Sequence, residues 1–218
     1  MVFRDRREAG ELLAGAIVRK YDGNLKDPVV VAIPRGGVIV AEPIAEALNA
    51  PIELVIPRKI GAPFNEEFAV AAVTEDGTIL MNPSVNDEVA YRLGVTKEYL
   101  ERKALEEIKE IERRKMKYLG NRERVPLTGR DVILVDDGIA TGLTVKAAIL
   151  SLRKEKPKRI ILAVPVMPAD RVEEFQQIVD DLIVLHTPHF FQAVGQFYQD
   201  FSQTTDEEVI EVINRLHP

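Results

Sequence analysis

Five short apolar runs, separated by segments with helical periodicity, restrict this chain to one broad fold class. The runs are Val29–Ile33, Ile52–Ile56, Val132–Val135, Ile160–Val164 and Leu182–Leu185. Continuous apolar runs of this length, bounded by turn residues, are typical of strands that are buried on both faces of a parallel sheet. Strands that alternate with helices form α/β domains with right-handed crossovers. The pattern therefore predicts an α/β fold with a mainly parallel sheet flanked by helices.

Helices are expected where apolar residues recur along one helical face. The expected segments are Glu8–Lys20, Val38–Leu48, Thr96–Lys117, Val145–Lys154 and Asp206–Leu216. One segment departs from the alternation, because Glu75-Asp76-Gly77 separates Ala69–Thr74 from Thr78–Met81 and is typical of a hairpin turn. We expect this hairpin to lie at the edge of the main sheet or above it.

Composition excludes several classes of protein and site. The chain has 218 residues, of which 46% are hydrophobic, and is expected to form a single domain over residues 1–218. It has no cysteine, which excludes disulfides and thiolate metal sites, and a net charge of −6, which argues against nucleic-acid binding. No two-histidine metal motif is present, so we expect no metal bound directly by the protein. The N-terminus is charged and no apolar run approaches the roughly 20 residues of a membrane span, which predicts a cytoplasmic protein that does not enter a membrane.

The third apolar run leads directly into Asp136 and Asp137, and the turn Thr141–Thr144 follows. Ligands of parallel sheets bind just beyond the carboxyl ends of the strands, where this segment lies. Two adjacent carboxylates are unfavourable there unless a cation or hydroxyl groups meet them. The turn offers backbone amides, two hydroxyls and a helix N-terminus, which suit a phosphate. The segment therefore predicts a site for a sugar phosphate.

The order Asp-Asp-x-x-x-Thr-Gly-x-Thr after an apolar strand resembles the phosphoribosyl-pyrophosphate motif of type I phosphoribosyltransferases. The resemblance implies that Asp136 and Asp137 bind the ribose hydroxyls and are the candidate catalytic residues. It also implies that the 5-phosphate is bound by Ala140, Thr141, Gly142, Leu143 and Thr144. The alternative is an ordinary strand-to-helix turn with acidic surface residues. A response-regulator interpretation of the two acids leaves the Thr-Gly-x-Thr turn unexplained.

Cations follow the first two apolar runs. Arg35 stands beside Gly36 and Gly37, which allow a close backbone approach, and its guanidinium can bind two phosphate oxygens at once. Arg58 and Lys59 follow the second run, where two adjacent cations indicate an anion. In the type I family the corresponding segments face the pyrophosphate. The alternatives are a tight turn with a surface arginine and an exposed basic pair.

Two further segments have a structural and a functional interpretation. The basic run Arg113–Arg124 is either a solvated helix end or, through Arg122, Arg124 or the irregular stretch Asn121–Pro126, a cover for the pyrophosphate. The C-terminal aromatic residues either stack on a planar base or pack a small cap, and they are Phe190, Phe191, Phe197, Tyr198 and Phe201.

The resemblance extends over most of the chain to a group of bacterial predicted phosphoribosyltransferases of unassigned acceptor, through phrases such as Pro-Arg-Gly-Gly and Asp-Asp-Gly-x-Ala-Thr-Gly. It implies a type I core with a small hood, built from the N-terminal segment and residues 187–218. It also implies a pentosyltransferase of nucleotide metabolism that transfers 5-phosphoribosyl from phosphoribosyl pyrophosphate to a small nitrogenous, base-like acceptor and releases pyrophosphate. Mg²⁺ would be bound mainly through the substrate, and homodimers are common in the family. The alternative is a non-catalytic regulatory protein that senses phosphoribosyl pyrophosphate.

Overall fold

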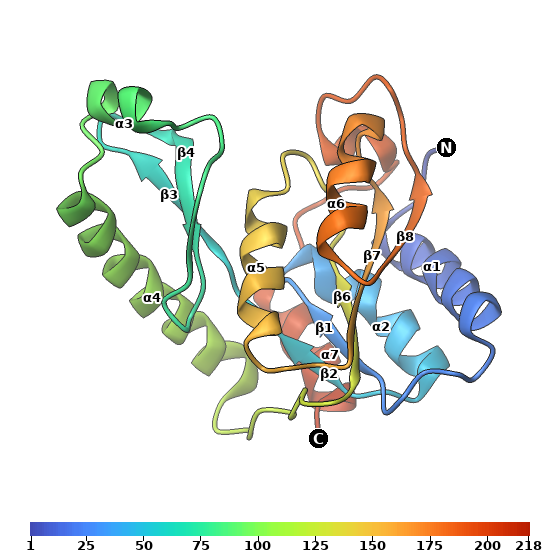
Figure 1. Cartoon of the computed structure of the whole chain (residues 1–218). Helices are drawn as coiled ribbons and strands as arrows, with labels where there is room; N and C mark the ends of the chain where they lie inside the picture. Colours follow the sequence, from blue (N-terminus) through green and yellow to red (C-terminus); the bar gives the residue numbers. More distant parts are fainter. The chain divides into compact units, whose positions relative to one another are not determined.

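Five strands form one parallel sheet in the computed structural model, which describes residues 1–218. The sheet has the order β2-β1-β6-β7-β8 (Figure 1), and its strands are β1 (Val29–Ala32), β2 (Ile52–Leu54), β6 (Asp131–Val135), β7 (Arg159–Val166) and β8 (Asp181–His186). Every neighbouring pair is parallel. All residues of β1 and β6 are buried. Apart from Asp131, which begins β6 and pairs with Arg159 at 2.7 Å, they are apolar, as strands covered on both faces require. The α/β prediction is confirmed, and each of the five apolar runs contributes one strand.

The contacts within the chain divide it into two units. The first unit comprises Met1–Val55, Tyr118–Thr141 and Glu155–Pro218, and the second comprises Ile56–Lys117 and Gly142–Lys154. The parallel sheet belongs to the first unit. The prediction that a single domain covers the whole chain stays a prediction.

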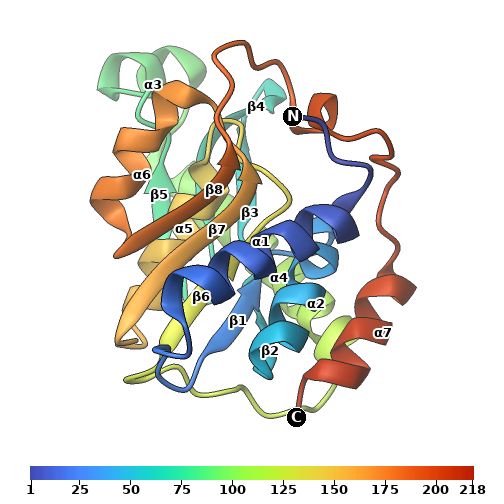
Figure 2. The ribbon, with the colours of Figure 1, turned by 90° about the vertical axis from the view of Figure 1, so that its right-hand side faces the viewer.

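Helices of the first unit cover the parallel sheet. They are α1 (Arg6–Tyr21), α2 (Gly36–Leu48), α6 (Val172–Ile178) and α7 (Asp206–Leu216), with short 3₁₀ turns at Ala169–Arg171 and Val194–Phe197. Helices α1 and α2 lie side by side on one face of the sheet (Figure 2). Helix α1 begins where the Asp5 carboxylate accepts a hydrogen bond from the Glu8 amide, and α7 begins with a capping box between Thr205 and Glu208. These caps fix the starts of the two helices that flank the candidate site.

The second unit contains a separate antiparallel sheet of three strands. Its strands are β3 (Arg58–Ala62), β4 (Asn65–Val73) and β5 (Ile79–Met81), in the order β3-β4-β5. Strands β4 and β5 confirm the predicted hairpin. Its predicted place at the edge of the main sheet is wrong, because the hairpin belongs to a separate sheet in which β4 pairs with β3 and β5. The alternative, a place above the main sheet, stays a prediction. The remaining helices are α3 (Asp87–Leu93), α4 (Lys97–Leu119) and α5 (Leu143–Arg153), of which α5 contacts β4 and β5.

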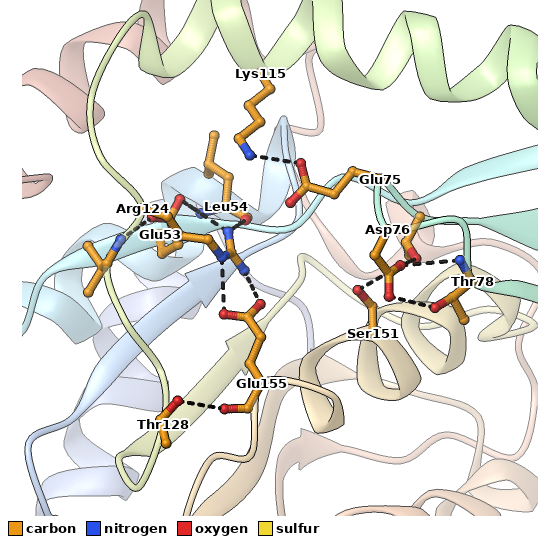
Figure 3. A network of polar contacts seen from close by, with 12 residues as sticks. Glu53, Leu54, Glu75, Asp76, Thr78, Lys115, Arg124, Thr128, Ser151 and Glu155 are labelled. Carbon is orange, nitrogen blue, oxygen red and sulfur yellow. Dashed lines mark hydrogen bonds and ion pairs between the residues drawn. The ribbon is translucent and has the colours of Figure 1, made fainter.

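The hairpin turn is tied to α5 by Asp76. The Asp76 carboxylate accepts hydrogen bonds from the hydroxyls of Thr78 and Ser151 (Figure 3). It also accepts one from the Thr74 hydroxyl, and Nζ of Lys154 lies 3.1 Å from its Oδ2. These bonds hold the pKa of Asp76 below its ordinary value, although burial acts in the opposite direction. The turn therefore has a structural role. No helix of the chain combines the length and apolar character needed to cross a bilayer.

Candidate functional site

Asp136 and Asp137 follow β6 directly and are half-buried at the carboxyl end of the parallel sheet. The Asp137 amide donates to Oδ1 of Asp136 at 2.8 Å, so the first carboxylate folds back over the turn. The Tyr198 hydroxyl donates to the backbone carbonyl of Asp137 at 2.6 Å. The acid pair is therefore held through its backbone as well as through its side chains.

Arg6 of α1 completes this arrangement, and the sequence analysis missed it. Its Nε lies 2.9 Å from Oδ2 of Asp137, and the two side chains are only 12% and 17% exposed. The guanidinium carbon of Arg6 lies 4.0 Å from the centre of the Phe201 ring, and Nη1 donates to the Ser202 carbonyl at 2.7 Å. No local signal distinguishes Arg6 from Arg4 or Arg7, because its partner lies 131 positions away.

The environment of the pair disfavours two ionised carboxylates. Burial, followed by the charge of Asp137, raises the pKa of Asp136 well above its ordinary value, while Arg6 acts to lower it. A ligand with hydroxyl donors would supply hydrogen bonds that favour the charged forms. The chemistry of the pair therefore fits a diol or a cation.

Gly36 and Gly37 begin α2 immediately beside the acids. A β-carbon on Gly36 would lie 2.1 Å from Oδ2 of Asp137, and one on Gly37 would lie 2.9 Å from the Val135 carbonyl. The two glycines are therefore needed for the close approach of α2 to the end of β6. Arg35 follows a cis peptide bond, and its Nη1 lies 3.7 Å from Oδ1 of Asp206 at the start of α7.

The predicted phosphate turn forms the start of α5. Gly142 adopts a φ of 83°, which favours glycine, and no side chain caps the helix. The first amides of α5 therefore have no side-chain acceptor and suit an anion. Ala140 and Thr141, which precede the helix, are exposed. Within its first turn Leu143 is buried and Thr144 is half-buried.

Arg58 and Lys59 stand in the second unit, in a setting that differs from the prediction. They begin strand β3 and do not form a loop after β2, which already ends at Leu54. Arg58 Nε lies 2.7 Å from Oε2 of Glu107 on α4, while Lys59 is exposed. Strand β3 was not predicted from the sequence, because its two charged residues and its glycine are not typical of a strand.

Arg122 and Arg124 of the basic run contact side chains of the first unit. Nη2 of Arg124 lies 2.6 Å from Oε1 of Glu155, and its Nη1 lies 3.8 Å from Oε1 of the buried Glu53 (Figure 3). Arg122 donates to the Asn214 side chain at 2.7 Å. These contacts favour a structural role for Arg122 and Arg124 over a cover for the pyrophosphate.

The C-terminal aromatic residues pack mainly against one another and the N-terminal segment. Phe197 and Tyr198 are buried with Phe3, and the Phe3 amide donates to the Phe197 carbonyl at 2.8 Å. Phe191 stacks on Phe197 and Phe201 on Tyr198, with ring centres 5.3 and 5.1 Å apart. This packing favours the small-cap interpretation for these residues, whereas Phe190 is 89% exposed. The two chain ends predicted to form a hood thus lie together beside Asp137.

Comparison with known proteins gives a consistent result. A family model described as a phosphoribosyl transferase domain matches residues 5–201. Proteins from two strains of Mycobacterium tuberculosis, provisionally named phosphoribosyl transferases, are 39% identical over 216 residues. The match covers 99% of this chain and 47% of each relative, so the chain spans about half the length of these relatives.

Two solved structures support the fold. The crystal structure of TT1426 from Thermus thermophilus has a TM-score of 0.81 and 39% identity, and the match covers 100% of both chains. The structure of the AQ2163 protein from Aquifex aeolicus has a TM-score of 0.51 and 14% identity, with 87% of this chain and 76% of that chain covered. At that identity the second match concerns the fold alone.

Proposed function

We propose that this chain, which belongs to the phosphoribosyl transferase family, transfers the 5-phosphoribosyl group from phosphoribosyl pyrophosphate to a nitrogenous, base-like acceptor. A nitrogen of the acceptor forms a bond to the anomeric carbon of the ribose, and the bond from that carbon to the pyrophosphate oxygen breaks. The acceptor loses a proton and pyrophosphate leaves. The observation that carries the proposal is the half-buried acid pair at the end of β6, followed by the uncapped start of α5.

In this proposal Asp136 and Asp137 accept hydrogen bonds from the two ribose hydroxyls. Their negative charge also stabilises the positive charge that develops on the sugar ring as the leaving group departs. The amides of Gly142, Leu143 and Thr144 bind the 5-phosphate together with the preceding residues Ala140 and Thr141. Holding acceptor and leaving group in line can contribute about 7–11 kcal/mol to the lowering of the barrier.

Arg35, Gly36 and Gly37 are proposed to bind the pyrophosphate, with Arg58 and Lys59 as further cations for it. Arginine side chains suit this task because they donate two parallel hydrogen bonds to phosphate oxygens. The charge on the leaving pyrophosphate is thereby stabilised. The proposal for these five residues rests on their place in the family motif and on their chemistry.

Mg²⁺ fits the proposed site as a metal carried by the donor. No three acidic or histidine side chains gather into a protein-made metal site anywhere in the chain. Mg²⁺ retains most of its water ligands and commonly binds through substrate phosphates. When bound, it would neutralise charge on the pyrophosphate, while the protein residues position the ribose and the 5-phosphate.

The proposal includes the surroundings of the reaction. The N-terminal segment and residues 187–218 would form the hood that selects the acceptor, and the protein would act in cytoplasmic nucleotide metabolism as a homodimer. Sedimentation velocity of the purified chain tests the last point, since a monomer at micromolar concentration would contradict it.

Release of pyrophosphate tests the proposed activity. The chain is incubated with phosphoribosyl pyrophosphate, Mg²⁺ and a panel of purines, pyrimidines and their analogues, and pyrophosphate is measured for each. We expect release with at least one base and none without an acceptor, and Asp137→Asn should abolish it. Tight binding of the donor without turnover on any acceptor would instead favour a sensor, because the same fold serves both purposes.

A further inference from the structure

Arg6 lies outside the sequence motif, yet its side chain contacts the proposed ribose-binding pair. The first turn of α1 brings Nε of Arg6 within 2.9 Å of Oδ2 of Asp137, with both side chains largely shielded from water. A charge-assisted hydrogen bond in such a setting is stronger than one between neutral groups. The contact therefore fixes the direction of the Asp137 carboxylate.

The position of Arg6 is itself fixed from several sides. Asp5 caps the helix on which Arg6 stands, the Ser202 carbonyl accepts a hydrogen bond from Nη1, and the ring of Phe201 lies against the guanidinium. Gly36 leaves the necessary space, because a β-carbon there would lie 2.7 Å from Nε of Arg6. Contacts from two distant chain segments thus orient one side chain toward Asp137.

The charges around the pair explain what Arg6 contributes. Asp136 and Asp137 are adjacent carboxylates that repel each other. Tyr198, which is bonded to the Asp137 carbonyl, is a neutral phenol, and the Arg35 guanidinium lies 3.7 Å from the Asp206 carboxylate. Arg6 is therefore the cation that offsets one of the two carboxylate charges.

We propose that Arg6 is a positioning residue that holds Asp137 in its ribose-binding orientation and offsets one negative charge of the acid pair. This inference rests on the proposed function. It implies that Arg6 matters for ligands that contain ribose and not for pyrophosphate alone. A purely structural role of Arg6 would make no such distinction.

Binding measurements with Arg6→Gln, Arg6→Lys and wild type test the inference. Ribose 5-phosphate, phosphoribosyl pyrophosphate and inorganic pyrophosphate are titrated by calorimetry in the presence of Mg²⁺. We expect Arg6→Gln to weaken ribose 5-phosphate binding by about tenfold or more, the usual effect of losing a charged hydrogen bond, and to leave pyrophosphate binding unchanged. Arg6→Lys, which keeps the charge, should recover part of the affinity.

Arg7→Gln is the matched control. Arg7 stands on the same helix, but its Nη1 lies 3.0 Å from Oε2 of Glu42, and it pairs with neither Asp136 nor Asp137. This variant should bind all three ligands like wild type. Circular dichroism and thermal unfolding verify that each variant is folded.

The pH dependence of binding gives a second readout. Removing Arg6 takes away the cation that acts to lower the pKa of Asp136, so the pH above which ribose 5-phosphate binds fully should rise. An unchanged profile, unchanged ribose 5-phosphate affinity in Arg6→Gln, or equal weakening of pyrophosphate binding would overturn the inference. Wild type that binds neither ribose ligand would reject the proposed function itself, which is a distinguishable result.

Discussion

Gly36 and Asp137 lie so close together that a single methyl group would not fit between them. A β-carbon on Gly36 would lie 2.1 Å from Oδ2 of Asp137. This carboxylate cannot simply swing aside, because its contact with Arg6 at 2.9 Å would be lost. The glycine at the start of α2 and the acid at the end of β6 therefore depend on each other.

Gly36→Ala should displace the acid pair. We expect a loss of about 1–3 kcal/mol in the free energy of unfolding from overpacking, together with a weaker affinity for ribose 5-phosphate. Urea unfolding and calorimetry measure the two effects. Gly15→Ala is the control, because its β-carbon would meet only the flexible end of Arg19, and it should leave ligand affinity unchanged. Normal ligand affinity in Gly36→Ala would contradict the close packing.

Asp136→Asn should stabilise the ligand-free protein while removing ribose binding. The pKa of Asp136 is raised by burial and by Asp137, so the ionised carboxylate destabilises the fold. The stability that comes from its protonation is complete below its unfolded pKa of 3.8 and is lost as the pH rises through the higher pKa in the folded state. We therefore expect the free energy of unfolding of the variant to exceed that of wild type near neutral pH and to differ little from it below about pH 4. Urea unfolding at both pH values checks this, and a variant that is less stable at neutral pH would disprove it.

The sequence was sufficient to predict the parallel sheet for a clear physical reason. Strands such as β1 and β6 are buried on both faces, and the apolar runs Val29–Ile33 and Val132–Val135 suit that environment. Strand β3 was not predictable in this way, since it starts with Arg58-Lys59 and belongs to a small antiparallel sheet. Helix α3 was also missed, because none of its residues is buried and it therefore lacks an apolar face.

The candidate site was predictable only where its residues are adjacent in the sequence. Asp136 and Asp137 stand next to each other after a strand, and the residues up to Thr144 follow directly, so their spacing carries the signal. The contact of Arg6 with Asp137 arises from tertiary folding alone. It depends on where α1 packs and on the C-terminal segment that holds the guanidinium, which no local pattern encodes.

Gly142→Ala should separate phosphate binding from backbone strain. Gly142 has a φ of 83°, where another residue costs about 1–2 kcal/mol. Gly120 has a φ of 59° and open space around it, so Gly120→Ala should destabilise the fold through the same backbone effect. We expect similar unfolding free energies for the two variants, but a loss of ribose 5-phosphate affinity only in Gly142→Ala. Equal affinities in calorimetry would argue against a phosphate site at the start of α5.

Arg124→Ala tests the structural interpretation of the basic run. Arg124 pairs with Glu155 and also approaches Glu53, whose side chain is fully buried. Its removal should lower the free energy of unfolding by about 1–3 kcal/mol, because a buried carboxylate loses a nearby cation. Pyrophosphate affinity should stay at the wild-type value, because the Arg124 guanidinium lies near Glu155 and Glu53 and has no proposed role in the donor site. A large fall in pyrophosphate affinity with little change in stability would reverse the assignment and make Arg124 part of the donor site.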